Sequence, residues 1–314
     1  MSKTLRLCVL LLALCMALVG CAQQPIEEQG EQIEQRTIYT SFFPLYTLAQ
    51  GILDGVPGMQ LKCLVQPQDG CLRLYDLSDW DLTRILASDA IIIGGRGLES
   101  FETTLISLGE DGPALMSVMD GLTLEGTSSV DVDGEQQSHL EGQNPWLFLS
   151  VDGAEQISEM IAGGMVTLDP GYQAAYDSNF EKRSKQLEQL RGQMLEALLS
   201  VDPQPVALMH EGLIYLAQDL GLHVVARVDR EPGSTLYGAD WDEALLQLNE
   251  SGAKIVLLER QAPQHMIEAL EQAGYDPVLI DTFSTFPFDA DSGHYDRTML
   301  ANAEAIAQAF KDHK

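Results

Sequence analysis

The cysteines are the residues whose type and spacing most directly suggest chemistry. Cys8, Cys15 and Cys21 lie near the start of the chain, which leaves Cys63 and Cys71 in the remainder. In an exported protein, an even pair this close in sequence predicts a disulfide between Cys63 and Cys71. Closing so short a loop would stabilise the fold by roughly 2–3 kcal/mol. Two reduced thiols, or a metal-binding Cys71, are the alternatives.

The start of the chain has the pattern of an export signal. Basic residues precede an apolar segment over residues 7–19, which is too short for an ordinary membrane-spanning helix. The segment closes with the tetrapeptide LVGC, which resembles a bacterial lipobox and ends at Cys21. We therefore expect residues 1–21 to be a lipoprotein signal peptide, with lipid attached to Cys21 after cleavage. A plain membrane anchor and a secreted form without lipid are the alternatives.

Composition and charge exclude several functions. The chain has 314 residues, 45% of them hydrophobic, which is enough to bury one or two cores. Its 18 basic and 47 acidic residues give a formal charge of −29. Such a protein repels nucleic acid and has no basic patch for anionic lipid, so we expect membrane contact through the lipid anchor only. The Gln/Glu-rich residues 22–35 are typical of a flexible tether.

No catalytic motif stands out. The sequence lacks the G-x-S-x-G and H-E-x-x-H patterns, a paired-carboxylate motif, a G-x-G-x-x-G turn and a Walker loop. We therefore expect a protein that is not an enzyme and that needs no catalytic cofactor.

From residue 36 onward, short apolar segments alternate with amphipathic ones. This alternation predicts parallel sheets in an α/β fold. The predicted strands are residues 36–41, 60–65, 90–94, 206–209, 223–228, 254–258 and 278–280, and the predicted helices include residues 45–53, 79–87, 240–249, 263–273 and 295–310.

One segment interrupts the alternation. Residues 169–200 are rich in helix formers and predict a long helix of about 45 Å. A helix of this length between two strand–helix regions indicates a connection between two lobes. We expect an N-terminal α/β lobe over residues 36–168 and a C-terminal α/β lobe over residues 201–314. The alternative is an ordinary helix inside one large domain.

Seven short segments occur in a characteristic order along the chain. They are TSFFPL at 40–45, SDA through GGRGLE at 88–99, NPWLFLS at 144–150, HEG from His210, EP at 231–232, LE at 258–259 and DTF from Asp281. With these segments, the chain resembles the substrate-binding lipoproteins of zinc and manganese ABC transporters over residues 36–312. The resemblance implies a two-lobed periplasmic-binding-protein-like fold with a long, rigid interlobe helix.

The resemblance also implies a metal site, of which this chain keeps half. His210 and Asp281 stand at family ligand positions, and each follows a predicted strand, where parallel sheets present ligand groups. The two family histidines of the first lobe are replaced by Arg73 and Trp146. Arginine has no lone pair and carries a fixed charge, and the indole N–H cannot bind a metal.

A zinc site normally has about four donors at about 2.0–2.3 Å. Cys71, His139 and Glu259 are the possible substitute ligands, although a disulfide would remove Cys71 and a structural hydrogen bond would occupy Glu259. Alternatively, Arg73 and Trp146 bind an organic anion, or Arg73 pairs with a nearby carboxylate.

The resemblance implies an extracytoplasmic, lipid-anchored binding component of an ABC importer, with Zn²⁺ or Mn²⁺ as the transported ligand. Its partners would be the permease and ATPase of that importer, and we expect a monomer. The alternative is a divergent lipoprotein of the same fold that binds no metal and acts as an organic-anion binder, adhesin or scaffold.

Overall fold

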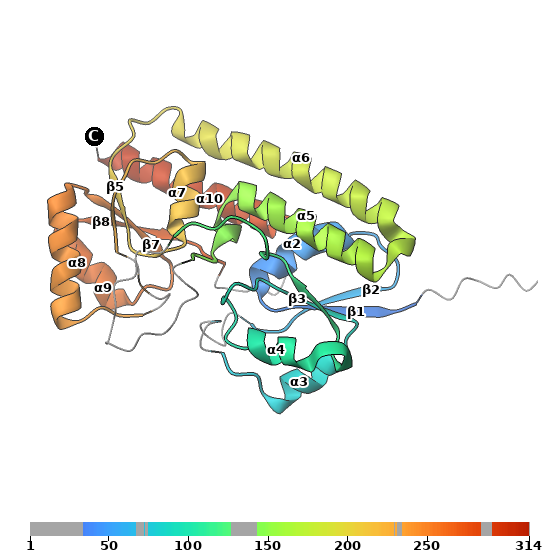
Figure 1. Cartoon of the computed structure of the whole chain (residues 1–314). Helices are drawn as coiled ribbons and strands as arrows, with labels where there is room; N and C mark the ends of the chain where they lie inside the picture. Colours follow the sequence, from blue (N-terminus) through green and yellow to red (C-terminus); the bar gives the residue numbers. More distant parts are fainter. Residues whose placement is uncertain are drawn as a thin grey trace, which may run out of the picture. The chain divides into compact units, whose positions relative to one another are not determined.

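The computed structural model describes residues 34–66, 72, 75–126, 143–228, 230, 234–283 and 291–313. Every helix and strand within these ranges lies in one compact unit, Gln35–Lys314 (Figure 1). The unit contains two parallel four-stranded sheets with helices packed around them, which confirms the predicted two-lobed α/β fold.

The N-terminal sheet has the strand order β2-β1-β3-β4. Its two central strands are buried on both faces, because alternate side chains enter different cores. In β3, Ala90 and Ile92 face the helices between the lobes, whereas Ile91 and Ile93 face a smaller outer core. The strands are β1 (Arg36–Thr40), β2 (Met59–Cys63), β3 (Ala90–Ile93) and β4 (Ala114–Ser117).

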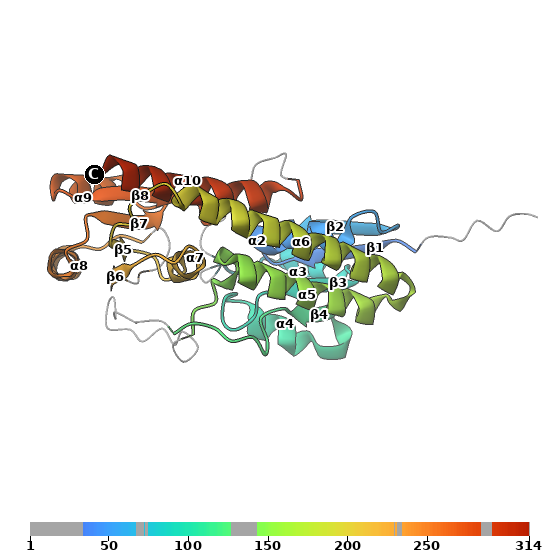
Figure 2. The same ribbon diagram turned by 90° about the horizontal axis from the view of Figure 1, so that it is seen from above.

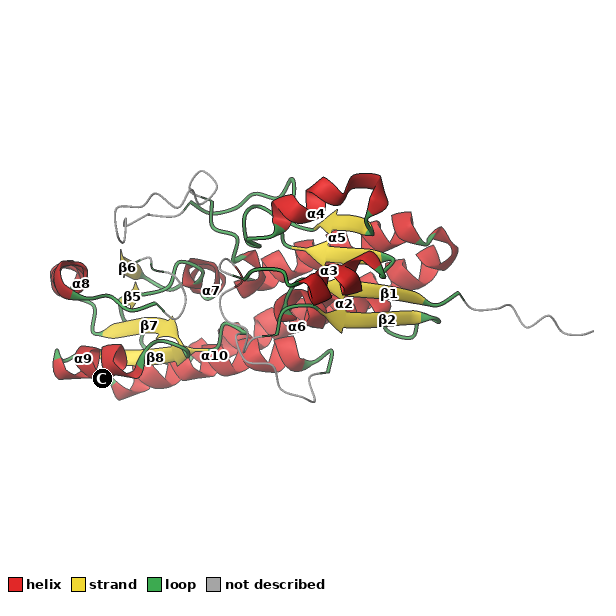
Figure 3. Ribbon diagram, turned by 90° about the horizontal axis from the view of Figure 1, so that it is seen from below, coloured by secondary structure: helices red, strands yellow, loops and turns green. Residues whose placement is uncertain are grey.

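The C-terminal sheet has the strand order β6-β5-β7-β8. Its register pairs Leu208 with Leu257, and Glu259 with Ile280. Figure 3 shows the arrowheads of β2 and β8 pointing toward each other, so the carboxyl ends of the two sheets face the same region of the unit. The strands are β5 (Val206–Leu208), β6 (Val224–Arg227), β7 (Ile255–Glu259) and β8 (Asp276–Ile280).

Helices cover both faces of each sheet. In the N-terminal half they are α2 (Phe43–Leu53), α3 (Asp79–Leu86), α4 (Glu102–Leu108) and the short turn η3 (Gly109–Asp111). The segment η5 (Leu147–Leu149), α5 (Val151–Leu168), η6 (Pro170–Tyr172) and α6 (Gln173–Leu198) follows, and the C-terminal half adds α7 (Leu213–Asp219), α8 (Gly238–Ser251), α9 (Gln264–Gln272) and α10 (His294–Asp312). No helix of the described ranges is long and apolar enough to cross a membrane.

The long helix α6 lies between α5 and α10, and all three run along the length of the unit (Figure 2). Its buried side includes Leu187 and Leu190, at helical spacing. Arg183 is also buried there, and its guanidinium pairs with Asp296 of α10 at 2.7 Å and lies over the ring of Tyr295. One apolar core joins these helices to both sheets, so the sheets are held on a common helical support.

Candidate metal-binding site

His210 lies just beyond β5, at the carboxyl end of the C-terminal sheet, and its side chain is fully buried. Its Nδ1 atom accepts a hydrogen bond of 2.9 Å from the backbone N–H of Gly212. The neutral ring with this contact carries its proton on Nε2. A histidine that binds metal through Nε2 carries its proton on Nδ1, so metal binding there requires the Gly212 contact to break.

Trp146 lies directly against His210. The two rings meet edge to face, with centroids 4.8 Å apart and an interplanar angle of 76°. The indole Nε1 donates a hydrogen bond of 2.7 Å to Glu211 Oε1. A Cβ atom on Gly212 would lie 2.6 Å from the Cβ of Trp146, so this close approach requires glycine at 212. Trp146, for which the resemblance predicts a family histidine position, therefore packs on His210.

Asn144 fixes the backbone on both sides of this contact. Its side-chain nitrogen donates to the carbonyl oxygen of Glu211 at 2.8 Å, and its Oδ1 accepts from the N–H of Trp146 at 3.1 Å. The Asn144 carbonyl accepts a further hydrogen bond of 2.6 Å from the Tyr215 hydroxyl. The bonds to Glu211 and Tyr215 join the segment before α5 to the turn after β5 and to helix α7.

Asp281 lies just beyond β8, as predicted. Its backbone N–H and carbonyl both bond to the side chain of Asn302 in α10, each at 2.9 Å. Its Oδ1 atom accepts a hydrogen bond from the N–H of Phe283, which has a positive φ of 62° and stacks on Tyr295. The turn after β8 therefore holds the Asp281 carboxylate in place.

Glu259 ends β7, the strand between those of His210 and Asp281. Its Oε2 atom lies 2.5 Å from Nη2 of Arg230, and neither side chain is exposed. The predicted substitute ligand is thus engaged by an arginine. Arg230 has no role predicted from the sequence.

The spacing of the strands separates His210 from Asp281. Neighbouring strands lie about 4.8 Å apart, so β5 and β8 are about 10 Å apart at this edge. Within the described ranges, no three His, Cys, Asp or Glu side chains come together in a group that could hold a metal. His210 and Asp281 lie at the same edge of the sheet, with Glu259 between their strands.

Several predicted site residues lie outside the described ranges: Cys21, Cys71, Arg73 and His139. Cys63 is described; it is buried at the end of β2, and its Sγ lies 3.2 Å from the carbonyl oxygen of Val65. The disulfide with Cys71, the lipid on Cys21 and the roles of Arg73 and His139 stay predictions.

Glu99 is a buried carboxylate for which the sequence predicts no role. Its carboxylate accepts hydrogen bonds from Ser41 Oγ at 2.6 Å and from the N–H groups of Gly94 and Gly95. Burial raises its pKa to about 7, although the three hydrogen bonds act in the opposite direction. The GGRGLE segment could have indicated this glutamate-held turn, because glycines bring backbone N–H groups close to one side chain.

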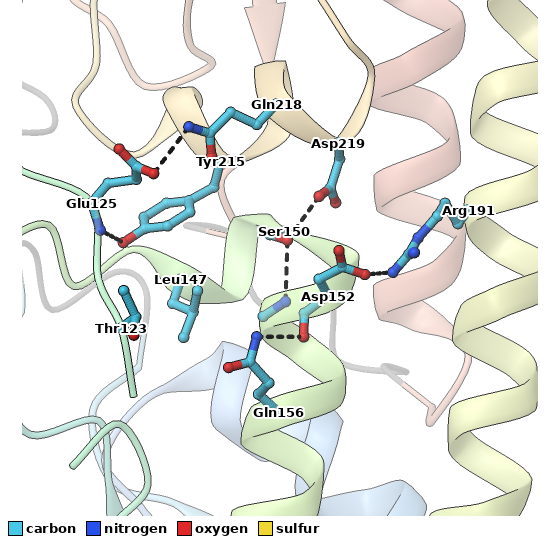
Figure 4. Close-up of a pocket in the computed structure, with 11 residues that line it drawn as sticks. Thr123, Glu125, Leu147, Ser150, Asp152, Gln156, Arg191, Tyr215, Gln218 and Asp219 are labelled. Carbon is cyan, nitrogen blue, oxygen red and sulfur yellow. Dashed lines mark hydrogen bonds and ion pairs between the residues drawn. The ribbon is translucent and has the colours of Figure 1, made fainter. Parts of the chain in front are cut away.

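A hollow of about 350 Å³ lies where the start of α5 meets α6 and α7 (Figure 4). Asp219 of α7 accepts hydrogen bonds there from Ser150 Oγ and from the N–H of Val151, at the first turn of α5. Gln218 donates to Glu125, and Arg191 pairs with Asp152. None of the predicted site residues is among those that line this hollow, and its polar groups bind one another across the junction.

Comparisons with known proteins match this architecture. A family model described as zinc-uptake complex component A, periplasmic (ZnuA), matches residues 38–309. The solved structure of the substrate-binding protein FpvC from Pseudomonas aeruginosa, in complex with Ni²⁺, is 21% identical, with a TM-score of 0.75. That match covers 90% of this chain and 98% of the FpvC chain.

Two further solved structures show the same fold. A crystal structure of ZnuA has a TM-score of 0.70 and 19% identity, and the match covers 88% of this chain and 100% of that chain. The laminin-binding protein Lmb of Streptococcus agalactiae, described as a bifunctional protein with adhesin and metal-transporting activity, has a TM-score of 0.70 and 18% identity. That match covers 87% of this chain and 98% of the Lmb chain.

Proposed function

Because the chain belongs to the family of periplasmic zinc-uptake complex components, we propose that it captures a divalent transition metal ion and delivers it to an ABC importer. The transported ion is zinc or manganese, and the partners are the permease and ATPase of that importer. The observation that carries the proposal is the position of His210 and Asp281, which follow β5 and β8 at one edge of the C-terminal sheet. An imidazole and a carboxylate are donors that both metals accept.

Metal capture in this chain involves a rearrangement at His210. The ring turns, or its Nδ1 gains a proton, so that the contact with the Gly212 N–H is lost when the imidazole binds the ion. The remaining ligands come from water or from the predicted substitutes Cys71 and His139. A site in which only His210 and Asp281 stand at predicted ligand positions binds metal more weakly than a site with four protein donors.

Attachment to the membrane is part of the proposal. Residues 1–21 act as the signal peptide, Cys21 carries the lipid, and residues 22–35 form the tether of a monomeric binding unit. Membrane fractionation after expression in a bacterial host tests this. The wild-type chain should sediment with membranes. Mass spectrometry of the N-terminal peptide should detect no lipid in Cys21→Ala.

A second candidate function is a divergent member of the fold that binds no metal and serves as an organic-anion binder, adhesin or scaffold. The packing of Trp146 on His210 favours it, because the indole occupies space beside the retained histidine. Lmb, which shares the fold, is described as both adhesin and metal transporter. A chelator distinguishes the two functions, because it should change the protein only if the protein binds metal.

Metal accumulation in cells tests the leading proposal. Deletion of the gene should lower cellular zinc or manganese during growth on limiting metal, and the wild-type gene should restore it. His210→Ala should fail to restore accumulation. His223→Ala, the same change at an exposed histidine, should restore it fully. Restored accumulation with His210→Ala would contradict the proposal.

A further inference from the structure

The buried pair of Arg230 and Glu259 carries a further inference. The guanidinium Nη2 lies 2.5 Å from Glu259 Oε2, and both side chains are 0% exposed. Arg230 also donates through Nη1 to the carbonyl oxygen of Ser234 at 2.9 Å. Removing two charges from water costs free energy, which good pairing geometry and further hydrogen bonds must offset. The fold therefore holds the two side chains in a defined position.

The sheet topology places this pair at the proposed metal site. Arg230 follows β6, Glu259 ends β7, and β5 lies between these two strands. The ion pair therefore crosses the carboxyl end of β5, from which His210 emerges. Because Leu208 is in register with Leu257, the position of His210 is level with that of Glu259.

The chemistry of Glu259 without its partner would be that of a metal ligand. A carboxylate between the strands of His210 and Asp281 would add an oxygen donor to the two retained positions. Arg230 supplies a fixed positive charge and a fork of N–H donors to that carboxylate, and it cannot be neutralised by deprotonation. The guanidinium neutralises the Glu259 carboxylate, as a bound metal ion would. Its positive charge also repels a divalent ion beside it.

We propose that Arg230 limits the metal affinity of the site, because it occupies the cation position of Glu259 and thereby withholds this carboxylate from the transported metal. The inference rests on the proposed function in taking His210 and Asp281 as the other ligands. It predicts that Arg230 lowers the affinity of the site for Zn²⁺ and Mn²⁺.

The test is a double-mutant cycle on the full chain, with Zn²⁺ and Mn²⁺ affinities measured by calorimetric titration after chelator treatment. Arg230→Met keeps much of the side-chain length, removes the charge and should bind at least one of the metals tenfold or more tighter than the wild type does. Adding Glu259→Gln should abolish this gain. Arg260→Met, the same change at the exposed arginine beside Glu259, should leave both affinities unchanged.

Glu259→Gln alone gives a second measurement that does not depend on the folding of Arg230→Met. Since Arg230 already occupies the carboxylate, this variant should keep the wild-type affinities within twofold. A tenfold loss of metal affinity in Glu259→Gln would overturn the inference. So would a folded Arg230→Met variant with no gain in metal affinity, or a gain that persists when Glu259→Gln is added. Absence of metal binding by the wild type would instead contradict the proposed function, and a gain in Arg230→Met would still support the role of Arg230.

Discussion

The indole Nε1 of Trp146 donates a hydrogen bond to Oε1 of Glu211 across 2.7 Å. Trp146 precedes α5 and Glu211 follows β5, so the bond joins two segments that are 65 positions apart in the chain. The sequence resemblance predicts a histidine ligand at the position of Trp146. In this structure the hydrogen bond to Glu211 and the ring contact with His210 connect the segment before α5 to the segment after β5.

Replacing Trp146 with phenylalanine should lower the free energy of unfolding by about 1–2 kcal/mol, because a smaller aromatic ring remains while the Glu211 carboxylate loses its donor. Urea denaturation measures this change. Trp80→Phe is the control, since Trp80 is 68% exposed and its loss should cost no more than about 0.5 kcal/mol. Equal stability of the two variants would show that the bond to Glu211 contributes nothing.

Trp146→His should raise the affinity for Zn²⁺, or at least not weaken it. The substitution replaces an indole that cannot ligate with an imidazole, beside a ring whose centroid is 4.8 Å from that of Trp146. Calorimetric titration of the two proteins measures the difference, with Trp80→His as the control for an added exposed histidine. Weaker binding by Trp146→His would place the metal away from this contact.

Glu99 should make stability depend on pH. Its pKa is raised from 4.5 to about 7 by burial, so between these pH values the folded state retains a proton that the unfolded state has released. Stability therefore falls as pH rises through this window, by about 3 kcal/mol in total.

Denaturation of the wild type and of Glu99→Gln between pH 4 and 8 measures this contribution. The difference between the two proteins should change across the window, whereas Glu110→Gln, at an exposed position, should follow the wild type throughout. A pH-independent difference between the wild type and Glu99→Gln would rule out the raised pKa.

Asp219→Ala should lower the free energy of unfolding by about 1–2 kcal/mol. The carboxylate accepts hydrogen bonds from Ser150 Oγ and Val151 N–H, and its loss leaves the first turn of α5 without these acceptors. Thermal and urea unfolding measure the effect against Asp202→Ala, which removes an exposed carboxylate. Similar stability of the two variants would mean that water replaces Asp219 at this junction without cost.

The alternation of apolar and amphipathic segments predicted most strands, and the long helical segment over residues 169–200 indicated the two lobes. Strand β4 and helix α5 are among the elements that escaped prediction, and both have a physical reason. Strand β4 is a short edge strand of four residues after Gly112-Pro113, and helix α5 contains Gly153 and Gly164, which weaken a helical pattern. In the fold both glycines allow close packing. A Cβ atom at position 153 would lie 2.1 Å from the carbonyl oxygen of Leu147, and a Cβ atom at position 164 would lie 2.7 Å from the sulfur of Met116.

The candidate site was predicted in part. The places of His210 and Asp281 at strand ends follow from local patterns, and the structure has them there. The burial of Arg230 does not follow, because a charged segment between strands is typical of a solvated loop. Its partner Glu259 is 29 positions away, and β7 extends to this glutamate, one residue beyond the predicted end, where its charge is neutralised by Arg230.

The most direct test of metal capture is thermal unfolding of the chelator-stripped unit Gln35–Lys314, titrated with zinc and then with manganese. A ligand at about 1,000 times its Kd stabilises the folded state by about 4 kcal/mol, which raises the midpoint by several degrees. We predict a saturable rise with one equivalent of metal, which is lost in His210→Ala and kept in His223→Ala. No rise with any transition metal, or an equal rise in His210→Ala, would contradict a metal site built on His210 and Asp281.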